Sequence, residues 1–389
     1  MTRRYYAGRD FRRASNVEEL RRVAMRRVPR FAFEYLEGGA EDEASLRRNR
    51  DVFERIAWLP RTLAGAGVPV LSTEVLGETL HLPLVIAPTG FNGMLWPQGD
   101  LALARAAATA GIPFTLSTVS NYDVVKMGAE LPGTTWFQLY PFKELKSLDR
   151  LVERAAEAGC RKLVVTTDVP ALGAREWDQR NYRKPMQLSL GSLLDVLAHP
   201  RWLRQVMIPN GAPEFANLAE FLPAGRRSAF QGVRFMGTQI NPSLSWADIE
   251  RVRKRWKGEL LLKGILCVED ARRSVEIGAD GVVLSNHGGR QLDTAVSGVE
   301  LLPAVADAVG ERTTIIVDGG FRRGSDVLKA LALGADAVML GRATLYGLAA
   351  GGEEGVSHAL GLLRTEMERT MTLLGCHSLA ELGPHLIRS

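Results

Sequence analysis

The sequence has little cysteine, no long apolar run and only a small excess of positive charge. Its three cysteines, Cys160, Cys267 and Cys376, lie far apart, which excludes a disulfide framework and the ligand spacing of a zinc site and suits a reducing cytoplasm. No run of about eighteen residues is both apolar and uncharged, so we expect no membrane-spanning helix. The basic first residues lack an apolar core, so we expect no signal peptide.

Charge and composition narrow the class of protein further. Forty-nine Lys and Arg against 44 Asp and Glu leave a net charge of +5 over 389 residues. This excess is too small and too diffuse to predict nucleic-acid binding, and it leaves small anions or a lipid surface as partners. An apolar share of 46% and 39 scattered glycines are typical of a folded enzyme with many tight turns.

Eight short apolar runs recur along the chain, each followed by a polar turn and a helical pattern. Runs that are apolar on both faces indicate strands of a parallel sheet covered by helices. The expected strands are 84–87, 114–117, 135–139, 163–167, 260–263, 282–285, 314–317 and 337–340. Their alternation with helices over 82–375 predicts an α/β fold, the (β/α)8 TIM barrel, with a doubly wound open sheet as the alternative.

Local signals support the helices between these strands. The pattern predicts a helix over 143–158 and another directly after Ser245, which we expect to be its N-cap with Asp248 three residues on. Four glycines are placed to end helices in the left-handed conformation before the next strand begins. They are Gly111, Gly159, Gly278 and Gly334.

Two segments depart from this alternation of strands and helices. Residues 1–60 are expected to form a helical preface, broken at Gly38–Gly39, to a barrel domain over 61–389. An insertion is expected at about 176–240, with a polar loop after residue 209. Within it, residues 186–209 predict either a membrane-docking segment or a helix packed on the barrel as a lid. This segment combines leucines with Val196, Trp202, Arg201 and Arg204.

Polar and ionisable residues gather at the ends of the expected strands. In a barrel these ends share one face, where catalytic groups lie. Buried without partners, each group would cost about 1–3 kcal/mol, so their accumulation predicts a site. The residues are Thr89, Gly90, Ser117, Gln138, Tyr140, Thr166, Asp168, Lys263, His287, Arg290, Asp318, Gly320, Arg322, Gly341 and Arg342.

The loops after the last two strands have the composition of a phosphate site. Glycines there let backbone N–H groups approach an anion, and Arg322 and Arg342 add charge, although a plain surface turn is an alternative. Lys263 has three interpretations: a Schiff-base amine, the partner of a carboxylate, or a cation that stabilises negative charge on a bound ring.

His287 and Arg290 together predict acid–base chemistry on an acid. His287 lies in a glycine-rich turn rather than on an apolar face, so we interpret it as a base, with Arg290 as the anchor of a carboxylate. Asp168 would face the same mouth and orient the imidazole. Arg175 is either a second carboxylate clamp or an exposed loop arginine.

An ordered set of motifs from about residue 16 onward resembles the FMN-dependent L-2-hydroxy acid dehydrogenase/oxidase family. The motifs are Y-L-E-G-G-A-E-D-E (35–43), A-P-T-G (87–90), T-L-S-T (115–118), W-F-Q-L-Y (136–140), T-T-D-V-P (166–170), L-K-G-I (262–265), S-N-H-G-G-R-Q-L-D (285–293), D-G-G-F-R-R-G-S-D (318–326) and G-R (341–342). The resemblance implies an enzyme with FMN at the barrel mouth. The implied FMN contacts are Thr89, Gly90, Ser117, Gln138, Thr166, Lys263, Asp318, Gly320, Arg322, Gly341 and Arg342.

The resemblance also implies roles in catalysis. Lys263 would stabilise the anionic reduced flavin, and His287 would be the base, taking either the Cα proton or the hydroxyl proton. The implied catalytic residues are His287, Asp168, Tyr140, Arg290 and Lys263. The implied substrate contacts are Tyr35, Tyr140, Arg175 and Arg290.

The motifs are most similar to those of the mandelate-oxidising branch of this family. The expected reaction is oxidation of an (S)-2-hydroxy acid to a 2-oxo acid, with (S)-mandelate as the first substrate and L-lactate as the second. Electrons would pass to a quinone or protein carrier, because Gly90 stands where oxidases of the family usually have alanine. Val119 stands where glycolate oxidase has tryptophan, which predicts a roomier pocket. Ala171–Leu172 depart from the mandelate-oxidising branch.

The resemblance further implies a homo-oligomer, a tetramer, peripheral on the inner face of the cytoplasmic membrane. Three alternatives stay open. One is a peroxide-forming 2-hydroxy acid oxidase, and another is a Schiff-base aldolase or phosphosugar barrel that uses Lys263. The third is a flavin-binding barrel with no turnover.

Overall fold

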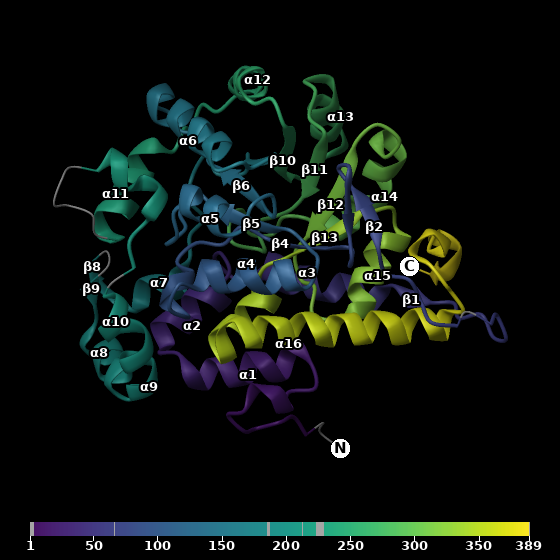
Figure 1. Cartoon of the computed structure of the whole chain (residues 1–389), viewed down its shortest axis with the longest axis horizontal. Coiled ribbons are helices and arrows are strands. Elements are labelled where there is room, and N and C mark those ends of the chain that lie inside the picture. The colour runs from purple at the N-terminus through teal and green to yellow at the C-terminus, as the bar shows by residue number, and fades with distance from the viewer. Residues whose placement is uncertain (1–3, 66, 185–186, 212, 223–228, 389) are drawn as a thin grey trace.

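The computed structural model describes residues 4–65, 67–184, 187–211, 213–222 and 229–388, and its centre is a closed barrel of eight parallel strands (Figure 1). The strands follow one another around the barrel in chain order. They are β4 (Leu84–Ile86), β5 (Phe114–Ser117), β6 (Thr135–Leu139), β7 (Lys162–Thr166), β10 (Glu259–Ile265), β11 (Gly281–Leu284), β12 (Thr314–Asp318) and β13 (Ala337–Leu340). The predicted TIM barrel is therefore confirmed, and the open sheet is excluded.

Helices cover the outside of the barrel. They are α4 (Gly99–Thr109), α5 (Val124–Glu130), α6 (Leu145–Glu157), α12 (Trp246–Arg255), α13 (Val268–Glu276), α14 (Gly298–Val309), α15 (Gly324–Ala332) and α16 (Arg342–Leu374). Ser245 is the N-cap of α12 and forms a capping box with Asp248, as expected. The four glycines predicted to end helices all have positive φ.

The interior of the barrel has an apolar part and a polar part. Buried apolar side chains from five strands form one cluster: Trp136, Val164, Leu261, Val283 and Ile316. Two residues further along the same strands stand buried polar side chains: Gln138, Thr166, Lys263, Ser285 and Asp318. Because side chains alternate along a strand, residues two apart point to the same side, here the interior. The carboxyl-terminal end of the barrel is therefore polar inside.

A hairpin of β2 (Thr73–Val75) and β3 (Glu78–Leu80) closes the other end of the barrel. Val75 and Leu80 pack against the apolar interior cluster, and Glu78 forms an ion pair with Lys162, which is buried at the start of β7. The sequence did not predict this hairpin, because its strands are only three residues long. The hairpin thus covers one end of the barrel, and the cavity opens at the carboxyl-terminal end.

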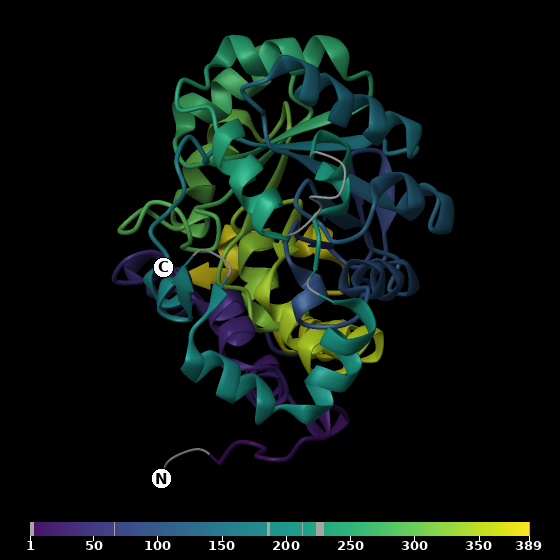
Figure 2. The same ribbon diagram turned by 90° about the vertical axis from the view of Figure 1, so that its left-hand side faces the viewer.

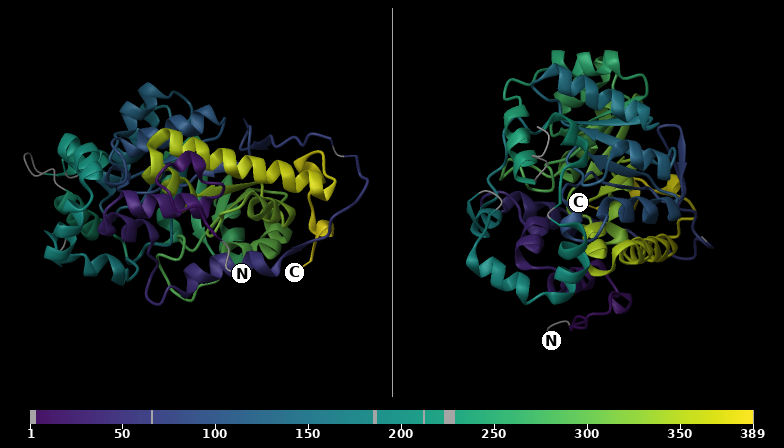
Figure 3. Two further views of the ribbon diagram at one scale, coloured as in Figure 1. Left: turned by 90° about the horizontal axis from the view of Figure 1, so that it is seen from below. Right: turned by 60° about the vertical axis from the view of Figure 1, so that its left-hand side comes forward.

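The chain that precedes the barrel is mainly helical. It comprises α1 (Val17–Arg27), α2 (Arg30–Glu37) and α3 (Ala44–Arg55). The long helix α16 packs against α1 and α4, and Figure 3 shows it running beside α1. The short strands β1 (Ala57–Trp58) and β14 (Ile387–Arg388) pair near the carboxyl terminus.

The insertion between β7 and β10 is present, and the predicted polar loop contains helical residues over 216–221 and 229–239; residues 212 and 223–228 of that loop lie outside the described residues. The elements of the insertion are α7 (Glu176–Arg180), β8 (Tyr182–Lys184), β9 (Gln187–Leu188), α8 (Leu190–Leu197), α9 (Pro200–Trp202), the π-helical turn η3 (Leu203–Met207), α10 (Ile208–Asn210), η4 (Ala216–Phe221) and α11 (Ala229–Gln239). They gather on one side of the barrel, which faces the viewer in Figure 2. The loop prediction was wrong because Val233, Met236 and Ile240 form a helical stripe that packs inward.

The predicted docking segment divides into an exposed part and a buried part. On α8, Leu190, Leu193, Leu194 and Leu197 are exposed. Trp202, which we had placed with them, is buried; its indole N–H donates to the Met94 carbonyl at 2.7 Å. Met186, the first residue of the predicted segment, lies outside the described residues. Within the described ranges, no helix is long and apolar enough to span a membrane.

The ion pair at the closed end of the barrel predicts an asymmetric response to mutation. Glu78→Gln leaves the buried Lys162 charge without its carboxylate and is expected to lower the free energy of unfolding by about 3 kcal/mol. Lys162→Met removes the buried charge, and Glu78 remains partly exposed to water, so this variant is expected to lose less than about 1 kcal/mol. Urea unfolding measures both variants. Equal losses would contradict the argument.

Candidate active site

The polar end of the barrel opens into a cavity of about 260 Å³. Its walls come from the ends of the barrel strands, from Tyr35 of α2 and from the insertion. Every residue predicted for the site lines this cavity except Asp168, which contacts His287. The structure therefore brings together residues that are spread over about three hundred positions of the sequence.

Three strand ends carry a fixed row of polar groups. The hydroxyl of Ser117 donates to Oε1 of Gln138 at 2.9 Å, and Nε2 of Gln138 donates to the hydroxyl of Thr166 at 2.9 Å. All three side chains are buried. Because each partner fixes the next, the row presents donors and acceptors in one defined arrangement.

Lys263 lies inside the barrel between two partners. Its Nζ is 2.9 Å from Oδ2 of Asp318 and 2.8 Å from Oγ of Ser285. This geometry supports the carboxylate-partner interpretation and disfavours a Schiff base, since the amine is not free to attack a carbonyl. The other oxygen of Asp318, Oδ1, is buried and has no hydrogen-bond partner among the described residues. An unpaired buried oxygen of this kind marks a place for a donor.

His287 is oriented by Asp168. Its Nδ1 lies 3.0 Å and 3.2 Å from the two carboxylate oxygens. A carboxylate can only accept, so Nδ1 carries the proton and Nε2 can accept one. Burial opposes ionisation of Asp168, but the charge and hydrogen bond of His287, with Lys263, lower the pKa of that carboxyl.

The backbone of His287 is also unusual. Its φ is 58°, and positive φ continues through Gly288 and Gly289. A residue other than glycine rarely adopts this conformation, and such strain is found at functional sites. The glycine-rich turn that singled out His287 in the sequence is therefore a left-handed turn in the structure.

Two arginines approach the ring of Tyr35. The guanidinium carbons of Arg290 and Arg175 lie 5.2 Å and 5.9 Å from the ring centre. Burial, together with the charges of Arg175 and Arg342, lowers the pKa of Arg290 to about 9. Positive charge concentrated at a cavity wall favours a bound anion. Since Arg175 lines the cavity, its placement supports the clamp interpretation over an exposed loop arginine.

The start of α16 has the features of a phosphate site. Gly341 caps this helix without a side chain, and a Cβ added to it would meet nothing within 4 Å. Free backbone N–H groups at a helix start attract anions. Arg322 also faces the cavity and donates to the hydroxyl of Tyr346 at 3.4 Å.

Arg342 has a different arrangement from the one expected. Its guanidinium donates to backbone carbonyls of Leu36, Glu37, Gly38 and Gly288. The side chain therefore ties α2 to the turn of His287. The unpaired Asp318 oxygen, the open space at Gly341 and a helix start without a side-chain cap together fit a ligand with hydroxyl groups and a phosphate, as FMN has.

Sequence reasoning missed two groups of residues. The first is an apolar wall of the cavity: Phe91, Phe215, Val233, Met236 and Ile240. The spacing of Val233, Met236 and Ile240 is a helical signal that could have found three of them, whereas Phe215 carries no signal in the sequence.

The second missed group supports the loops around the cavity. Asp100, fully buried at the start of α4, accepts from Nδ2 of Asn92 at 2.7 Å and from the backbone N–H of Asn121 at 3.0 Å. Asn92 in turn accepts from the hydroxyl of Thr89 at 3.1 Å. Burial raises the pKa of Asp100 to about 6, against these hydrogen bonds.

Comparisons with known proteins agree with this geometry. The model of the FMN-dependent dehydrogenase family matches residues 24–389. The chain is 45% identical over 375 residues to the (S)-mandelate dehydrogenase of Pseudomonas putida, covering 96% of this chain and 94% of that protein. It is 43% identical over 370 residues to the L-lactate dehydrogenase of Xanthomonas euvesicatoria pv. vesicatoria, covering 95% of each.

Solved structures that resemble this chain are also of mandelate-oxidising enzymes. The crystal structure of the monotopic membrane protein (S)-mandelate dehydrogenase has a TM-score of 0.92 at 45% identity and covers 97% of this chain and 99% of that one. A mandelate oxidase variant with (S)-mandelic acid has a TM-score of 0.80 at 36% identity, with 96% and 98% covered.

The raised pKa of Asp100 predicts a pH-dependent stability term. The protonated carboxyl favours folding, so its contribution is full below pH of about 4 and is lost as the pH rises through about 6. Asp100→Asn does not titrate. The melting temperature of the wild type relative to this variant should therefore fall between pH 4.5 and 7.5, by the equivalent of up to about 3 kcal/mol.

The exposed Asp307 of α14 offers a matched control, because Asp307→Asn removes a carboxylate at the surface. A difference between wild type and Asp100→Asn that stays constant over this pH range would contradict the assignment.

Proposed function

The chain belongs to the FMN-dependent dehydrogenase family, and we propose that it oxidises an (S)-2-hydroxy acid to a 2-oxo acid, with (S)-mandelate as its first substrate and L-lactate as its second. One observation carries the substrate class. His287, held by Asp168, lines the same cavity as Arg175 and Arg290, and residues of the insertion give this cavity an apolar wall. A base beside a carboxylate clamp matches an acid that carries a hydroxyl on its α-carbon.

FMN, when bound, takes up the two electrons released by the substrate. The residues that would hold its ring are Thr89, Gly90, Ser117, Gln138, Thr166 and Lys263. Asp318 would accept from the ribityl hydroxyls with its unpaired oxygen, and Gly320, Arg322 and Gly341 would bind the phosphate. Arg342, whose guanidinium donates to backbone carbonyls, would add positive charge beside it. The ammonium of Lys263 would oppose negative charge on the ring.

The chain's own groups bind the acid and take its proton. Arg175 and Arg290 would hold the substrate carboxylate, with the hydroxyls of Tyr35 and Tyr140 as further donors. Nε2 of His287 would accept the proton that leaves the substrate. Asp168 would stabilise the resulting imidazolium, because its lowered pKa keeps it ionised.

The proposed electron acceptor is a quinone or a protein carrier rather than oxygen. The surroundings of Gly90 support this part of the proposal. A Cβ added there would lie 2.8 Å from Cγ2 of Val119 and 3.2 Å from its carbonyl oxygen, so the alanine usual in the oxidases would require Val119 to move.

The proposed location is the inner face of a membrane, reached through the exposed face of α8. Leu190, Leu194 and Leu197, spaced along one face of the helix, are 68%, 68% and 66% exposed. A helix that served as a lid would bury such leucines against the barrel, so their exposure favours the docking interpretation. Arg201 and Arg204 are exposed in the next turns and could pair with lipid phosphates. A homo-oligomer, a tetramer by resemblance, completes the proposal.

Anaerobic flavin reduction tests the substrate. Mixing with (S)-mandelate or L-lactate should bleach the visible flavin band, with kcat/KM at least about tenfold higher for (S)-mandelate. His287→Gln should keep its flavin, and its rate of flavin reduction should be about 10²- to 10⁴-fold lower. Reoxidation should then be faster with a quinone analogue than with air. A band that neither acid bleaches would contradict the substrate class, and rapid reoxidation by air would contradict the acceptor.

Vesicle sedimentation tests the membrane proposal. The wild type should sediment with vesicles of phosphatidylglycerol and phosphatidylcholine. In the combined variant Leu190→Ser, Leu194→Ser, Leu197→Ser, the ratio of vesicle-bound to free protein should fall at least about tenfold. Each leucine that is buried in the lipid contributes about 1.5–3 kcal/mol to the binding free energy. Leu373→Ser, at an exposed leucine of α16, is the matched control. A wild type that stays in the supernatant, or a triple variant that still sediments, would refute docking through α8.

A further inference from the structure

A short stretch of the insertion, residues 214–217, is fixed to the loop that follows β5. The backbone N–H of Ala216 donates to the Ser120 carbonyl at 3.0 Å. Two residues earlier, the Glu214 carbonyl accepts from Nδ2 of Asn121 at 2.7 Å. Asn121 is itself held by Asp100, so this attachment reaches back to α4.

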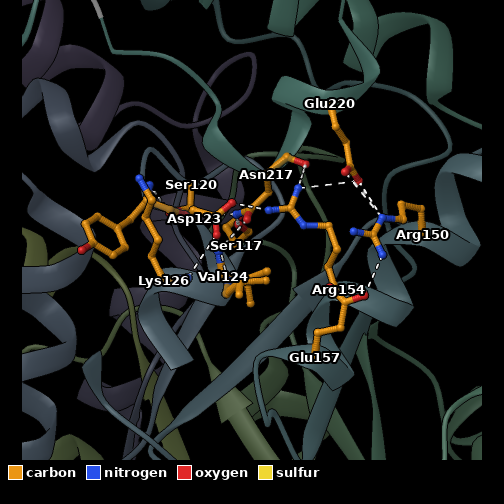
Figure 4. A network of polar contacts seen from close by, with 12 residues as sticks. Ser117, Ser120, Asp123, Val124, Lys126, Arg150, Arg154, Glu157, Asn217 and Glu220 are labelled. Carbon is orange, nitrogen blue, oxygen red and sulfur yellow. Dashed lines mark hydrogen bonds and ion pairs between the residues drawn. The ribbon is translucent and has the colours of Figure 1, made fainter. Parts of the chain in front are cut away.

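Asn217 makes the strongest of these attachments. It is fully buried, and its Oδ1 accepts from the backbone N–H of Val124 at 2.8 Å. Its Nδ2 donates to the carbonyls of Ser117, at 3.3 Å, and Tyr122, at 3.2 Å. Figure 4 shows this side chain between Ser117 and the start of α5. One amide therefore binds both ends of the loop after β5, beginning at a strand end that lines the cavity.

Ion pairs support this arrangement from the other side. Arg154 of α6, with its side chain 9% exposed, pairs with Asp123 and with Glu220, and its Nη1 is 3.5 Å from the Asn217 carbonyl. Arg150 pairs with Glu157 and Glu220, and Figure 4 shows both arginines converging on η4. The short helix η4 is thereby held to α6 as well as to β5.

Phe215 is the residue that these attachments place in the cavity wall. Its ring centre is 4.4 Å from that of Phe91, which is 5.5 Å from that of Tyr35. On its other side lies Gly232 of α11, where an added Cβ would be 2.3 Å from Cδ2 of Phe215. The ring is therefore confined on both sides, and three aromatic rings lead from the arginine clamp to the insertion.

We propose that Phe215 sets the size of the substrate side chain that the cavity accepts, and that Asn217 is the positioning residue that holds it there. This inference rests on the proposed function, since it assumes an acid bound by Arg175 and Arg290. In this proposal, an acid with its carboxylate at that clamp points its phenyl side chain along the row of rings toward Phe215. The methyl group of L-lactate is too short to extend along the row.

This role of Phe215 predicts that its substitution changes the ratio of kcat/KM between acids. Phe215→Leu and Phe215→Ala remove ring contact, so kcat/KM for (S)-mandelate should fall by about tenfold or more, mainly through KM, while that for L-lactate changes by less than about threefold. For an acid larger than mandelate, such as (S)-2-hydroxy-2-(2-naphthyl)acetate, kcat/KM relative to that for (S)-mandelate should rise in these variants. Phe215→Leu keeps the site apolar and serves if the alanine variant fails to fold.

Asn217→Asp tests the positioning role without touching the cavity wall. The carboxylate can still accept from Val124, but it loses both donors and faces two carbonyl oxygens. The ratio of kcat/KM for (S)-mandelate to that for L-lactate should fall by about tenfold, as in the Phe215 variants. Gln187→Glu, the same change of an amide to a carboxylate at an exposed position of the insertion, is the matched control and should leave the ratio unchanged.

The outcomes separate this inference from the proposed function. If neither acid reduces the flavin of the wild type, the proposed function fails. If both acids reduce it and the ratio is unchanged in the Phe215 variants, the specificity role is overturned. If the ratio moves in the Phe215 variants but Asn217→Asp only lowers the melting temperature, with equal losses for both acids, Asn217 is structural and its positioning role is overturned.

Discussion

A closed parallel barrel admits only every second residue of each strand to its interior, and the site depends on this constraint. At the carboxyl-terminal ends of β6, β7, β10, β11 and β12 stands a buried polar residue, and the inward residue two positions before it is apolar. The apolar layer rests on the β2–β3 hairpin, which closes the barrel below it. A shift of one strand by a single residue would turn Lys263 or Asp318 toward the helices, where neither would meet its partner.

The charges of the site are arranged so that some are paired and others are left for a ligand. Lys263 with Asp318, and His287 with Asp168, are paired within the protein. By contrast, Arg290 donates to the Gly38 carbonyl and has a lowered pKa beside other arginines, and the second oxygen of Asp318 meets no donor within the part of the chain that the structure describes. The concentrated positive charge of the arginines and the unpaired Asp318 oxygen therefore describe the ligands: an anion at the arginines, and hydroxyl groups and a phosphate between β12 and α16.

Much of this arrangement could be predicted from the sequence. The barrel strands are continuous apolar runs, and strand ends meet at one face in any parallel barrel, so the polar residues at those ends were found from position alone. The β2–β3 hairpin, Asp100 and Phe215 could not be found in that way. Phe215 lies at the cavity wall because its neighbours Asn217 and Glu214 are hydrogen-bonded to the loop after β5, about ninety residues earlier in the chain. No local sequence pattern records that contact. Trp202 was misassigned for a related reason, since its apolar neighbours are exposed whereas it binds Met94.

The central claim is that this polar barrel end holds FMN beside a paired, non-nucleophilic Lys263. The most direct measurement is the absorption spectrum of the purified protein, together with its FMN content and its response to borohydride in the presence of a carbonyl compound. The account predicts a yellow protein with about one FMN per chain and no covalent trapping of Lys263. A colourless protein whose Lys263 is trapped by borohydride would contradict it.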